Sequence, residues 1–477
     1  MQIIWILLAI LAILAAICIV RAALAKPSQE MPFVVTPERA ARSAKYAAGL
    51  VQLIRAETIS SRHDLDRTKF YMFHAILAKE FPNLHRVCDV HDFDGSLLFH
   101  WRGANADASP VLFLLHMDVV EAHPSEWKHD PFAGEIENGK IYGRGAIDNK
   151  SPMYIVMKAL DELVAENTIP PCDLYIASSC TEEIQGSGAK DMSRFLMEHG
   201  LRFRFIMDEG GMVVERPIKG IPGTYAVVGV SEKTQANVRL VARGTGGHAS
   251  APPRNTPLVR LGRLMADLDK KSPFHPKLEP FLLDVLRTVG LSLPFPARIV
   301  TENMWLFKPL IYIIAARIPM INAMTRTTVA FTKVQSVDGY NVLPKEASVN
   351  ANVRYAPHQG FAESNEILRK FAARYDVEIE LLDEGDYIPV TDYKSEAFKL
   401  VEGVINEIYP EIGVLPYMVT SGTDSKFYTS LSDNILRFVP LHISAAQVDS
   451  IHGSEENVDV NTLASGVDFV KLLVRKL

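Results

Sequence analysis

The sequence has few cysteines and no pair of them at metal-binding spacing. Four occur in 477 residues, and Cys88, Cys172 and Cys180 are too far apart to form a Cys-x-x-Cys motif. The fourth, Cys18, lies in an apolar segment near the N-terminus. A disulfide framework and a zinc site built from thiolates are therefore not expected.

The sequence also lacks any run rich in Lys or Arg. It carries 50 basic and 56 acidic side chains, which gives a formal net charge of -6 and a pI near 6.2. Nucleic acid is not expected as a partner, because the phosphate backbone is bound by a basic surface. With 48% hydrophobic residues, the chain is long enough to bury the cores of two domains.

One long hydrophobic run is present, from Ile3 to Val20, and it contains no charged residue. About 20 apolar residues suffice for a helix to cross a bilayer, so residues 1–25 are predicted to be a membrane anchor or a cleaved signal segment. No Lys or Arg precedes the run, which favours the anchor. The basic residues that follow, from Arg21 onwards, would place the body in the cytoplasm by a simple positive-inside count, so this pattern leaves the orientation open.

Short apolar strands alternate with helical patterns in residues 36–234. The alternation indicates βαβ units, and therefore an α/β fold with a mixed, mostly parallel sheet. We assign these residues to the first part of a catalytic domain. The predicted strands are 111–115, 174–177 and 203–207, and the predicted helices include 153–164 and 189–198.

The pattern changes between residues 235 and 385. Segments follow one another there in the order βαββαβ, which predicts a small α+β sandwich of a four-stranded antiparallel sheet and two helices, inserted into the larger domain. The α/β pattern resumes in residues 386–477, the second part of the catalytic domain. Residues 274–324 fit neither pattern. They form either a helical insert packed on the small domain or an apolar surface that faces a membrane or receives an apolar substrate tail.

Side chains that bind metals follow the predicted strands at the point where each strand ends. His116 follows the first strand, the pair Glu182-Glu183 follows the second and Asp208 follows the third. Ligands bind outside the carboxyl ends of parallel strands, so these groups are expected to meet. Zinc binds imidazole nitrogens and carboxylate oxygens, and two ions need roughly five or six such ligands. The candidate ligands are His116, Asp148, Glu183, Asp208 and His452.

Two carboxylates beside these ligands have other expected roles. Asp118 lies two residues after His116 on the same side of an extended segment, so it is expected to accept the second imidazole N–H. Glu182 is not needed as a ligand, and it is expected to act as the general base on a metal-bound water.

These motifs together resemble a superfamily of dizinc metallopeptidases that includes aminoacylases, carnosinases, glutamate carboxypeptidases and succinyl-diaminopimelate desuccinylases. The resemblance runs from about residue 44 to the C-terminus. It implies a zinc-peptidase-like catalytic domain with two Zn²⁺ per subunit. The motifs that carry it are residues 115–120, 143–151, 181–186 and 207–209. The implied ligands are His116 and Asp208 for one zinc, Glu183 and His452 for the other and Asp148 for both, with Glu182 as acid and base and Asp118 orienting His116.

The resemblance also implies that the inserted sandwich, residues 235–385, is a lid domain, and it implies roles for four residues outside the metal cluster. His248 would donate to the developing oxyanion, often across a dimer interface, so a homodimer formed through the lid is expected. Arg354 would hold a substrate carboxylate in bidentate geometry. Gly422 and Asn322 would contact the substrate.

Within this superfamily, the apolar start and the insert at 274–324 look most like the branch of carboxypeptidase S and N-fatty-acyl-amino-acid synthase/hydrolase. We therefore expect a zinc-dependent hydrolase of amide bonds that releases an amino acid with a free carboxylate. Its small-molecule substrates would be N-acyl amino acids, cleaved or formed reversibly, or short peptides. The alternatives are a carboxypeptidase or dipeptidase of the carboxypeptidase S type and, less favoured, a catalytically silent binding module. The branch acts outside the cytosol, so the body is expected to be extracytoplasmic, or secreted if the N-terminal segment is cleaved.

Overall fold

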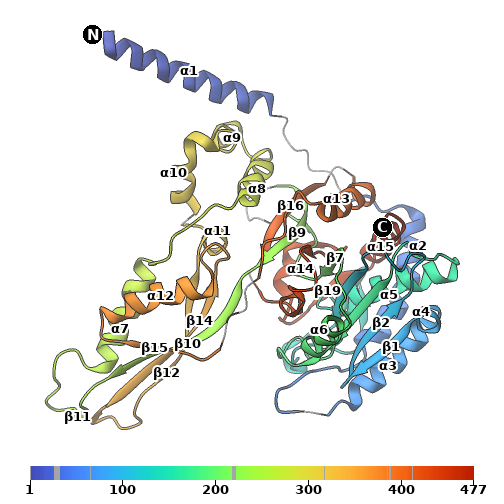
Figure 1. Ribbon diagram of the computed structural model, residues 1–477, viewed down its shortest axis with the longest axis horizontal. Helices are drawn as coiled ribbons and strands as arrows, with labels where there is room; N and C mark the ends of the chain where they lie inside the picture. Colours follow the sequence, from blue (N-terminus) through green and yellow to red (C-terminus); the bar gives the residue numbers. More distant parts are fainter. Residues whose placement is uncertain are drawn as a thin grey trace.

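The computed structural model describes residues 2–25, 33–64, 66–217, 222–315, 317–383, 385, 388–410, 412–419 and 421–477. The predicted start of the second catalytic segment, residue 386, lies outside these ranges. Figure 1 shows a large α/β unit, a smaller sheet with two helices beside it, and the helix α1 (Gln2–Leu24) at the top of the view.

The large unit is built on a ten-stranded mixed sheet. Hydrogen bonds order its strands β1-β2-β6-β3-β7-β17-β9-β8-β18, and β16 pairs with β9 off this path. The neighbours β6, β3, β7 and β17 run parallel to one another. The strands are β1 (Asp89–Phe93), β2 (Ser96–Trp101), β3 (Val111–His116), β6 (Leu174–Ser179), β7 (Phe205–Asp208), β8 (Val213–Glu215), β9 (Thr224–Glu232), β16 (Gly413–Val419), β17 (Ile435–Arg437) and β18 (His442–Ser444).

Helices cover both faces of this sheet. Val111 and Phe113 of β3 belong to the core under α2, α5, α13 and α15, whereas Leu112 and Leu114 belong to the core under α6. Because successive side chains of a strand point to opposite faces, a strand buried on both sides is a continuous apolar run. The helices are α2 (Pro37–Ile54), α5 (Lys150–Ala165), α6 (Gly188–Glu198), α13 (Glu396–Ile408) and α15 (Thr462–Arg475). Smaller elements are α3 (Thr68–Glu80), α4 (Pro82–Val87), η1 (Pro124–Glu126), β4 (Glu135–Glu137), β5 (Lys140–Tyr142), η2 (Asp424–Tyr428), α14 (Ala445–Ser450) and β19 (Asn457–Asp459).

The smaller unit is an antiparallel sheet in the order β12-β14-β10-β15, packed against two helices. Val238 of β10 and Val349 of β14 share a core with Leu264 of α7 and Leu368 of α12. The predicted α/β class with an inserted α+β sandwich is confirmed, whereas the exact domain limits stay a prediction. The elements are β10 (Thr234–Arg243), β11 (Gly247–His248), α7 (Pro257–Lys270), β12 (Thr328–Gln335), β13 (Val342–Leu343), β14 (Glu346–Tyr355), α12 (Gly360–Ala373) and β15 (Glu378–Leu381).

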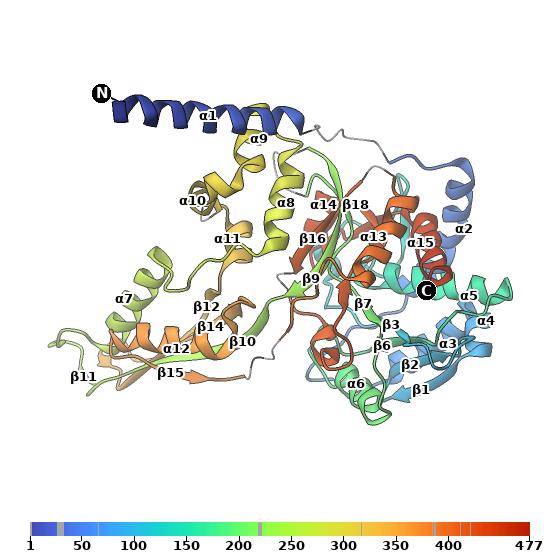
Figure 2. The ribbon, with the colours of Figure 1, turned by 45° about the horizontal axis from the view of Figure 1, so that its top comes forward.

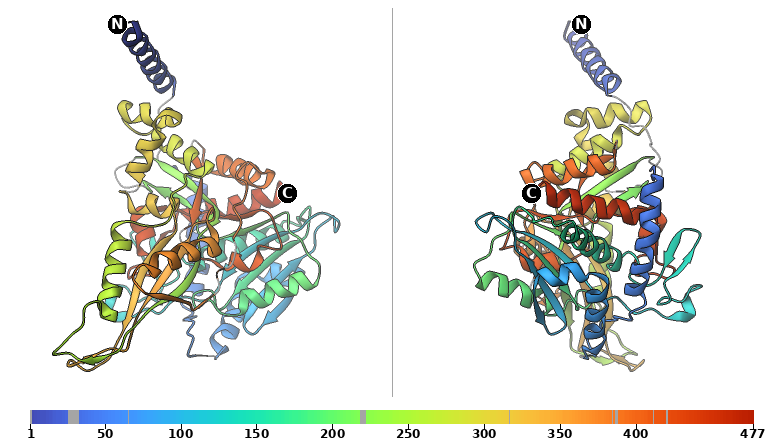
Figure 3. Two further views of the ribbon diagram at one scale, coloured as in Figure 1. Left: turned by 60° about the vertical axis from the view of Figure 1, so that its left-hand side comes forward. Right: turned by 90° about the vertical axis from the view of Figure 1, so that its right-hand side faces the viewer.

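The insert at residues 274–324 contains the helices α8 (Pro280–Gly290), α9 (Phe295–Glu302), α10 (Met304–Ala315) and α11 (Pro319–Thr325). The first interpretation of this stretch, a helical insert packed on the small domain, holds for its start, where Phe274 belongs to the core of the small unit. Helix α8 packs elsewhere. Val285 and Val289 pack instead against Tyr225 and Leu415 of the large sheet. Helix α9 lies against α1, as Figures 2 and 3 show from other directions. The insert therefore connects the large unit to the N-terminal helix.

Candidate metal and catalytic site

Three neighbouring parallel strands end beside one another at one edge of the large sheet. Strand β3 lies between β6 and β7 and runs parallel to both. His116 is the last residue of β3, Glu182 and Glu183 follow β6, and Asp208 is the last residue of β7. The sheet therefore brings these strand ends together, as the predicted parallel topology requires.

Asp148 lies between two histidines from distant parts of the sequence. Its Oδ1 atom is 2.8 Å from Nε2 of His116, and its Oδ2 atom is 3.1 Å from Nε2 of His452. Each carboxylate oxygen thus faces a different imidazole. A carboxylate shared by two metal ions, with one histidine on each ion, requires this arrangement of donors.

Two more carboxylates lie on either side of Asp148. The Oε2 atom of Glu183 is 3.2 Å from Nε2 of His452, and the Oε2 atom of Glu209 is 3.4 Å from Nε2 of His116. One ligand atom each of His116, Asp148 and Glu183 lies within 4.8 Å of the others. The cluster therefore offers a histidine and a carboxylate on each side of a central carboxylate.

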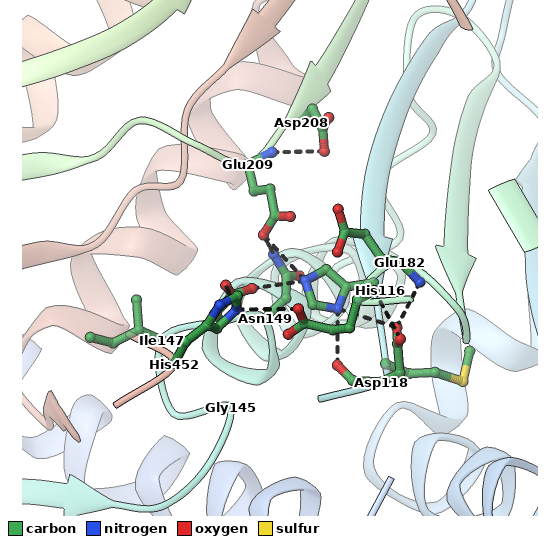
Figure 4. Close-up of polar contacts among 12 residues, drawn as sticks. His116, Asp118, Gly145, Ile147, Asn149, Glu182, Asp208, Glu209 and His452 are labelled. Atoms are coloured by element: carbon green, nitrogen blue, oxygen red, sulfur yellow. Dashed lines mark hydrogen bonds and ion pairs between the residues drawn. The ribbon is translucent and has the colours of Figure 1, made fainter. Parts of the chain in front are cut away.

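Asp208 is turned away from this cluster. Its Oδ2 atom accepts a 2.6 Å hydrogen bond from Oγ1 of Thr423. The next residue, Glu209, points toward His116 and accepts a 2.5 Å hydrogen bond from Nδ2 of Asn149. Figure 4 shows these two carboxylates in different places, with only that of Glu209 beside the imidazole. The geometry thus offers Glu209 where the sequence predicts Asp208, because neighbouring residues at a strand end point to opposite sides.

Asp118 fixes the loop that carries the two glutamates. Its carboxylate oxygens accept hydrogen bonds of 3.1 Å from the backbone N–H groups of Glu182 and Glu183. Nδ1 of His116 donates a 2.9 Å hydrogen bond to the main-chain carbonyl of Asp118, whose Oδ1 atom is farther away at 3.4 Å. This corrects the expectation that the carboxylate is the nearest partner of the imidazole: Asp118 orients His116 chiefly through its backbone.

Glu182 lies on the His116 side of the cluster. One ligand atom each of Glu182, His116 and Glu209 lies within 4.8 Å of the others. Figure 4 shows the Glu182 carboxylate pointing into the space beside Glu209 rather than toward Asp118, whose carboxylate holds the Glu182 backbone. The Glu182 carboxylate therefore lies beside the same imidazole as Glu209.

The cluster holds more acidic groups than its two histidines can neutralise. Burial raises the pKa of Glu182 well above its usual value, and burial together with Asp148 raises the pKa of Glu209 to about 8. Hydrogen bonds with Asp148 and Glu183 raise the pKa of His452 to about 10. Among the described residues, the buried Oε1 atom of Glu183 has no hydrogen-bond partner. Carboxylates and imidazoles are the donors that zinc prefers, so the cluster fits cations that would neutralise its acids.

A buried ion pair supports the loop that carries Asp148. Glu456 is fully buried and its carboxylate lies 2.8 Å from Nη1 of Arg144. The same carboxylate accepts hydrogen bonds of 2.8 to 3.1 Å from the backbone N–H groups of Gly145, Ile147 and Asp148. Burying a carboxylate is tolerated when its oxygens are satisfied in this way, so Glu456 fixes the position of the central ligand.

The predicted site residues include neither Glu209, although it lies in the motif 207–209, nor Glu456. Each follows another acidic residue, Asp208 and Glu455 respectively, and these acidic pairs are the one sequence signal that could have drawn attention to them. The pairs do not reveal which of the two side chains faces the site.

His248 lies far from the cluster within its own chain. It is an exposed residue of β11, at the outer tip of the lid in Figure 1, where its Nδ1 atom is 2.7 Å from Oγ of Ser250. The structure does not bring it to the strand ends. Its expected contact with an oxyanion across a dimer interface stays a prediction.

Arg354 lies at the end of the lid sheet that adjoins the large unit. In the antiparallel pairing of β14 with β10, Arg354 lies opposite Gln235, near the start of β10. Lys233, two residues before Gln235, joins β10 to β9. Its Nε atom donates a 3.0 Å hydrogen bond to Asn352, and its buried Nη1 atom has no partner among the described residues. Burial lowers the pKa of Arg354, and burial together with Arg354 lowers the pKa of Lys233 to about 7. This guanidinium retains donors for an anionic ligand.

Gly422 and Asn322 lie in different elements. Gly422 precedes η2, and a Cβ atom added there would meet nothing within 4 Å, so space is open beside this turn. Asn322 lies in α11, and its buried Oδ1 atom has no hydrogen-bond partner within the described part of the chain. The contact of either residue with substrate stays a prediction.

A buried network extends from the end of β7 to the lid. Oγ1 of Thr423, which donates to Asp208, also lies 2.9 Å from Oε2 of Glu232. Glu232 is the last residue of β9, and its carboxylate accepts a 3.0 Å hydrogen bond from Nε of the buried Arg437. No motif predicted this network. It satisfies Asp208 without a metal ion and leads to Lys233 at the start of the lid.

An apolar cavity of about 300 Å³ lies between helix α8 of the insert and the large sheet, where Val214 of β8, Val227 of β9 and Leu415 of β16 line it. Gly210, the residue after Glu209, lines it on one side, and Val448 of α14 lines it near the loop of His452. Leu282 of α8 and other apolar residues of the insert also line it. Along the chain the cavity comes nearest to the cluster at Gly210, the residue after Glu209.

Comparisons with known proteins agree with this architecture. The family model described as peptidase family M20/M25/M40 matches residues 112–476. The chain is 32% identical to the N-fatty-acyl-amino acid synthase/hydrolase PM20D1 of Homo sapiens over 80% of this chain and 76% of the relative. It is 28% identical to the probable carboxypeptidase S-like 2 of Dictyostelium discoideum over 87% of this chain and 81% of the relative. An M20 family metallo-carboxypeptidase of Sulfolobus solfataricus, Sso-CP2, shares the fold with a TM-score of 0.66 at 19% identity, covering 90% of this chain and 98% of that chain.

Proposed function

The chain belongs to peptidase family M20/M25/M40, the hydrolase family that its motifs predict, and from this premise we propose that it binds two zinc ions and hydrolyses N-acyl amino acids. The observation that carries the two-metal site is Asp148, whose two carboxylate oxygens face two different histidines. A site for one ion would need no such central carboxylate.

We assign the ligands from the distances in the cluster. Two ions bound there would lower the pKa of a bound water molecule and polarise the scissile carbonyl. His116, Asp148 and Glu209 would hold one ion, and Asp148, Glu183 and His452 would hold the other.

The side chains around the ions move the proton and hold the substrate. Glu182 accepts the proton of the attacking water and passes it to the leaving amine, so that it acts first as base and then as acid. Asp118 keeps Glu182 in place through the backbone N–H of that residue. His248 of the partner subunit donates to the developing oxyanion, which places a homodimer contact in the lid.

The apolar cavity favours acyl substrates over short peptides. A pocket of about 300 Å³ with an apolar lining suits an aliphatic tail, because burying apolar surface is its source of affinity. The similarity to an N-fatty-acyl-amino acid synthase/hydrolase supports this substrate class. The similarity to carboxypeptidase S-like proteins supports the alternative, a carboxypeptidase or dipeptidase.

The N-terminal helix is proposed to be an uncleaved anchor with the body on the extracytoplasmic side. Helix α1 is long and apolar enough to cross a membrane, and little of it is buried against the protein. A signal peptide passes the same test of length and composition, so sequencing the N-terminus of the mature protein would distinguish the two.

A substrate screen tests the proposed activity. The purified full-length enzyme, loaded with zinc, is incubated with matched pairs of long-chain N-acyl amino acids and dipeptides that release the same amino acid. We expect mass spectrometry to show faster release from the acyl substrates, because only they fill the apolar cavity. Faster release from the dipeptides would support the carboxypeptidase alternative, and release from neither series would refute amide hydrolysis.

Blocking the substrate carboxylate is expected to weaken binding through Arg354. A bidentate contact between guanidinium and carboxylate involves two charge-assisted hydrogen bonds, each worth roughly 1.5–3 kcal/mol, so the ester or amide of a good substrate should show a KM raised by about tenfold or more. Steady-state kinetics on the acid and its amide measure this. Arg354→Lys should reduce the difference between the two, whereas the same substitution at Arg369, elsewhere in the lid, should not; equal KM values for acid and amide would remove Arg354 from the site.

A further inference from the structure

Helix α10 exposes large apolar side chains to solvent. Its Ile311 is buried and belongs to the core of the large unit, but five apolar residues elsewhere on the helix are between 40% and 57% exposed. Helices on a protein surface normally turn polar residues to water, so a helix that is apolar on all sides belongs in a core or a membrane. These five residues, called here the α10 apolar face, are Trp305, Leu306, Leu310, Ile313 and Ile314.

Helix α10 begins directly after the point where the insert contacts α1, the one helix in the described chain that is long enough to span a bilayer. The residues of α1 that are buried, Cys18 and Ala22, are in its last two turns, where α9 packs. Asn303, between α9 and α10, donates a 3.0 Å hydrogen bond to the main-chain carbonyl of Cys18. Figures 2 and 3 both show the helices of the insert directly below α1.

The contact between Asn303 and Cys18 also fixes the level along α1 at which α10 begins. Cys18 lies six residues before Leu24, the end of α1, which corresponds to about 9 Å along the helix at its usual rise. Helix α1 is about 35 Å long by the same measure, and the hydrocarbon core of a bilayer is about 30 Å thick. If α1 spans the bilayer, the start of α10 is therefore at the membrane surface.

The composition of α10 matches that depth. Trp305 carries an indole, which is enriched at the level of the lipid headgroups, and the exposed Lys308 can extend its ammonium toward lipid phosphates. The helix contains no acidic residue, and the exposed Arg21 of α1 adds positive charge nearby. A partner with an apolar interior and an anionic surface, which is the chemistry of a phospholipid bilayer, fits this face.

We propose that the α10 apolar face is embedded in the bilayer surface beside α1, so that the large unit is seated on the membrane rather than tethered above it. This inference rests on the anchor in the proposed function. The helices on either side of α9 and α10, α8 and α11, contribute Leu282 and Met324 to the lining of the apolar cavity. Seating α10 in lipid therefore places that cavity close to the phase into which a long-chain acyl substrate partitions.

Tryptophan quenching in vesicles tests the contact directly. The chain has four tryptophans, of which Trp5 lies in α1, so full-length W5F and W5F/W305F proteins are compared in phosphatidylcholine vesicles. We expect lipids brominated on their acyl chains to quench the emission that Trp305 contributes, and aqueous iodide to leave it unchanged. Quenching by iodide alone would show a solvent-exposed face, and protection from both quenchers would show a face covered by protein; either result overturns the proposal.

A pair of charged variants tests the consequence for catalysis. Leu310→Glu/Ile313→Glu places two carboxylates on the α10 apolar face, and Val334→Glu is the control at a 60% exposed apolar residue of β12 in the lid. We expect the double variant to cleave a long-chain substrate in vesicles on the order of tenfold more slowly, because charge is expelled from lipid, while its rate on a short-chain substrate in water is unchanged. An unchanged vesicle rate would refute the membrane contact and leave the proposed function intact. Absence of cleavage of both substrates by the wild type would refute the proposed function, and the quenching result would still decide the contact.

Discussion

The Glu182→Gln enzyme is expected to retain its metal ions and to lose nearly all turnover. Glutamine preserves the size of the side chain and its place beside His116 and Glu209, but it cannot accept the proton of the attacking water. General acid–base catalysis contributes about 10²–10⁴-fold, and here one group serves both proton transfers, so kcat should fall by roughly 10³-fold or more. Steady-state kinetics, together with metal analysis by plasma mass spectrometry, measure both quantities on the same sample.

The control for this variant is Glu166→Gln, which removes a partly exposed carboxylate that pairs with Lys471 and Arg475. Exposed pairs of this kind contribute about 0–1 kcal/mol to stability, so the control should keep its kcat. Hydrolysis by Glu182→Gln at the native rate would exclude Glu182 as the base. A loss of metal from that variant would instead make Glu182 a ligand, which its short distance to His116 permits.

The sequence could predict the residues of the site whose positions follow from the topology of the sheet. His116 and the pair after β6 are adjacent because parallel neighbours must end at the same edge of a sheet. Asp148 and His452 come from loops, and only the family resemblance placed them in the cluster. The 3.1 Å distance between them fits that expectation, although no metal is needed to hold the loop of Asp148, which is fixed by Glu456.

The choice between Asp208 and Glu209 could not be predicted from the sequence. Adjacent side chains at a strand end alternate in direction, so one of them faces the cluster and the other cannot. Which one does so depends on Thr423, more than two hundred residues away, which provides the hydrogen bond that satisfies Asp208. A tertiary contact of this kind leaves no local pattern.

For the apolar insert and for His248, the sequence likewise does not reveal what the side chains contact. An apolar helix such as α10 must bury its surface, but its sequence does not say whether a core, a membrane or another chain will cover it. The position of His248 at the tip of the lid likewise does not say what the side chain contacts. A bilayer and a second copy of the chain are the partners that we propose for these two features.

The Glu209→Ala enzyme is expected to bind one zinc ion per chain instead of two, whereas Asp208→Asn should still bind two. Glu209 lies 3.4 Å from His116 and its removal leaves that ion with too few protein ligands, while Asn at 208 can still accept the hydrogen bond from Thr423. Removing a residue that only hydrogen-bonds to a metal ligand already costs about 10–100-fold in metal affinity or activity. Removing a ligand itself should therefore reduce kcat/KM by roughly 10²-fold or more. Metal titration of both variants, with their unfolding temperatures measured in parallel, decides between the two neighbours. Two ions in Glu209→Ala and one in Asp208→Asn would return the role to Asp208 and would require its side chain to leave Thr423 when metal binds.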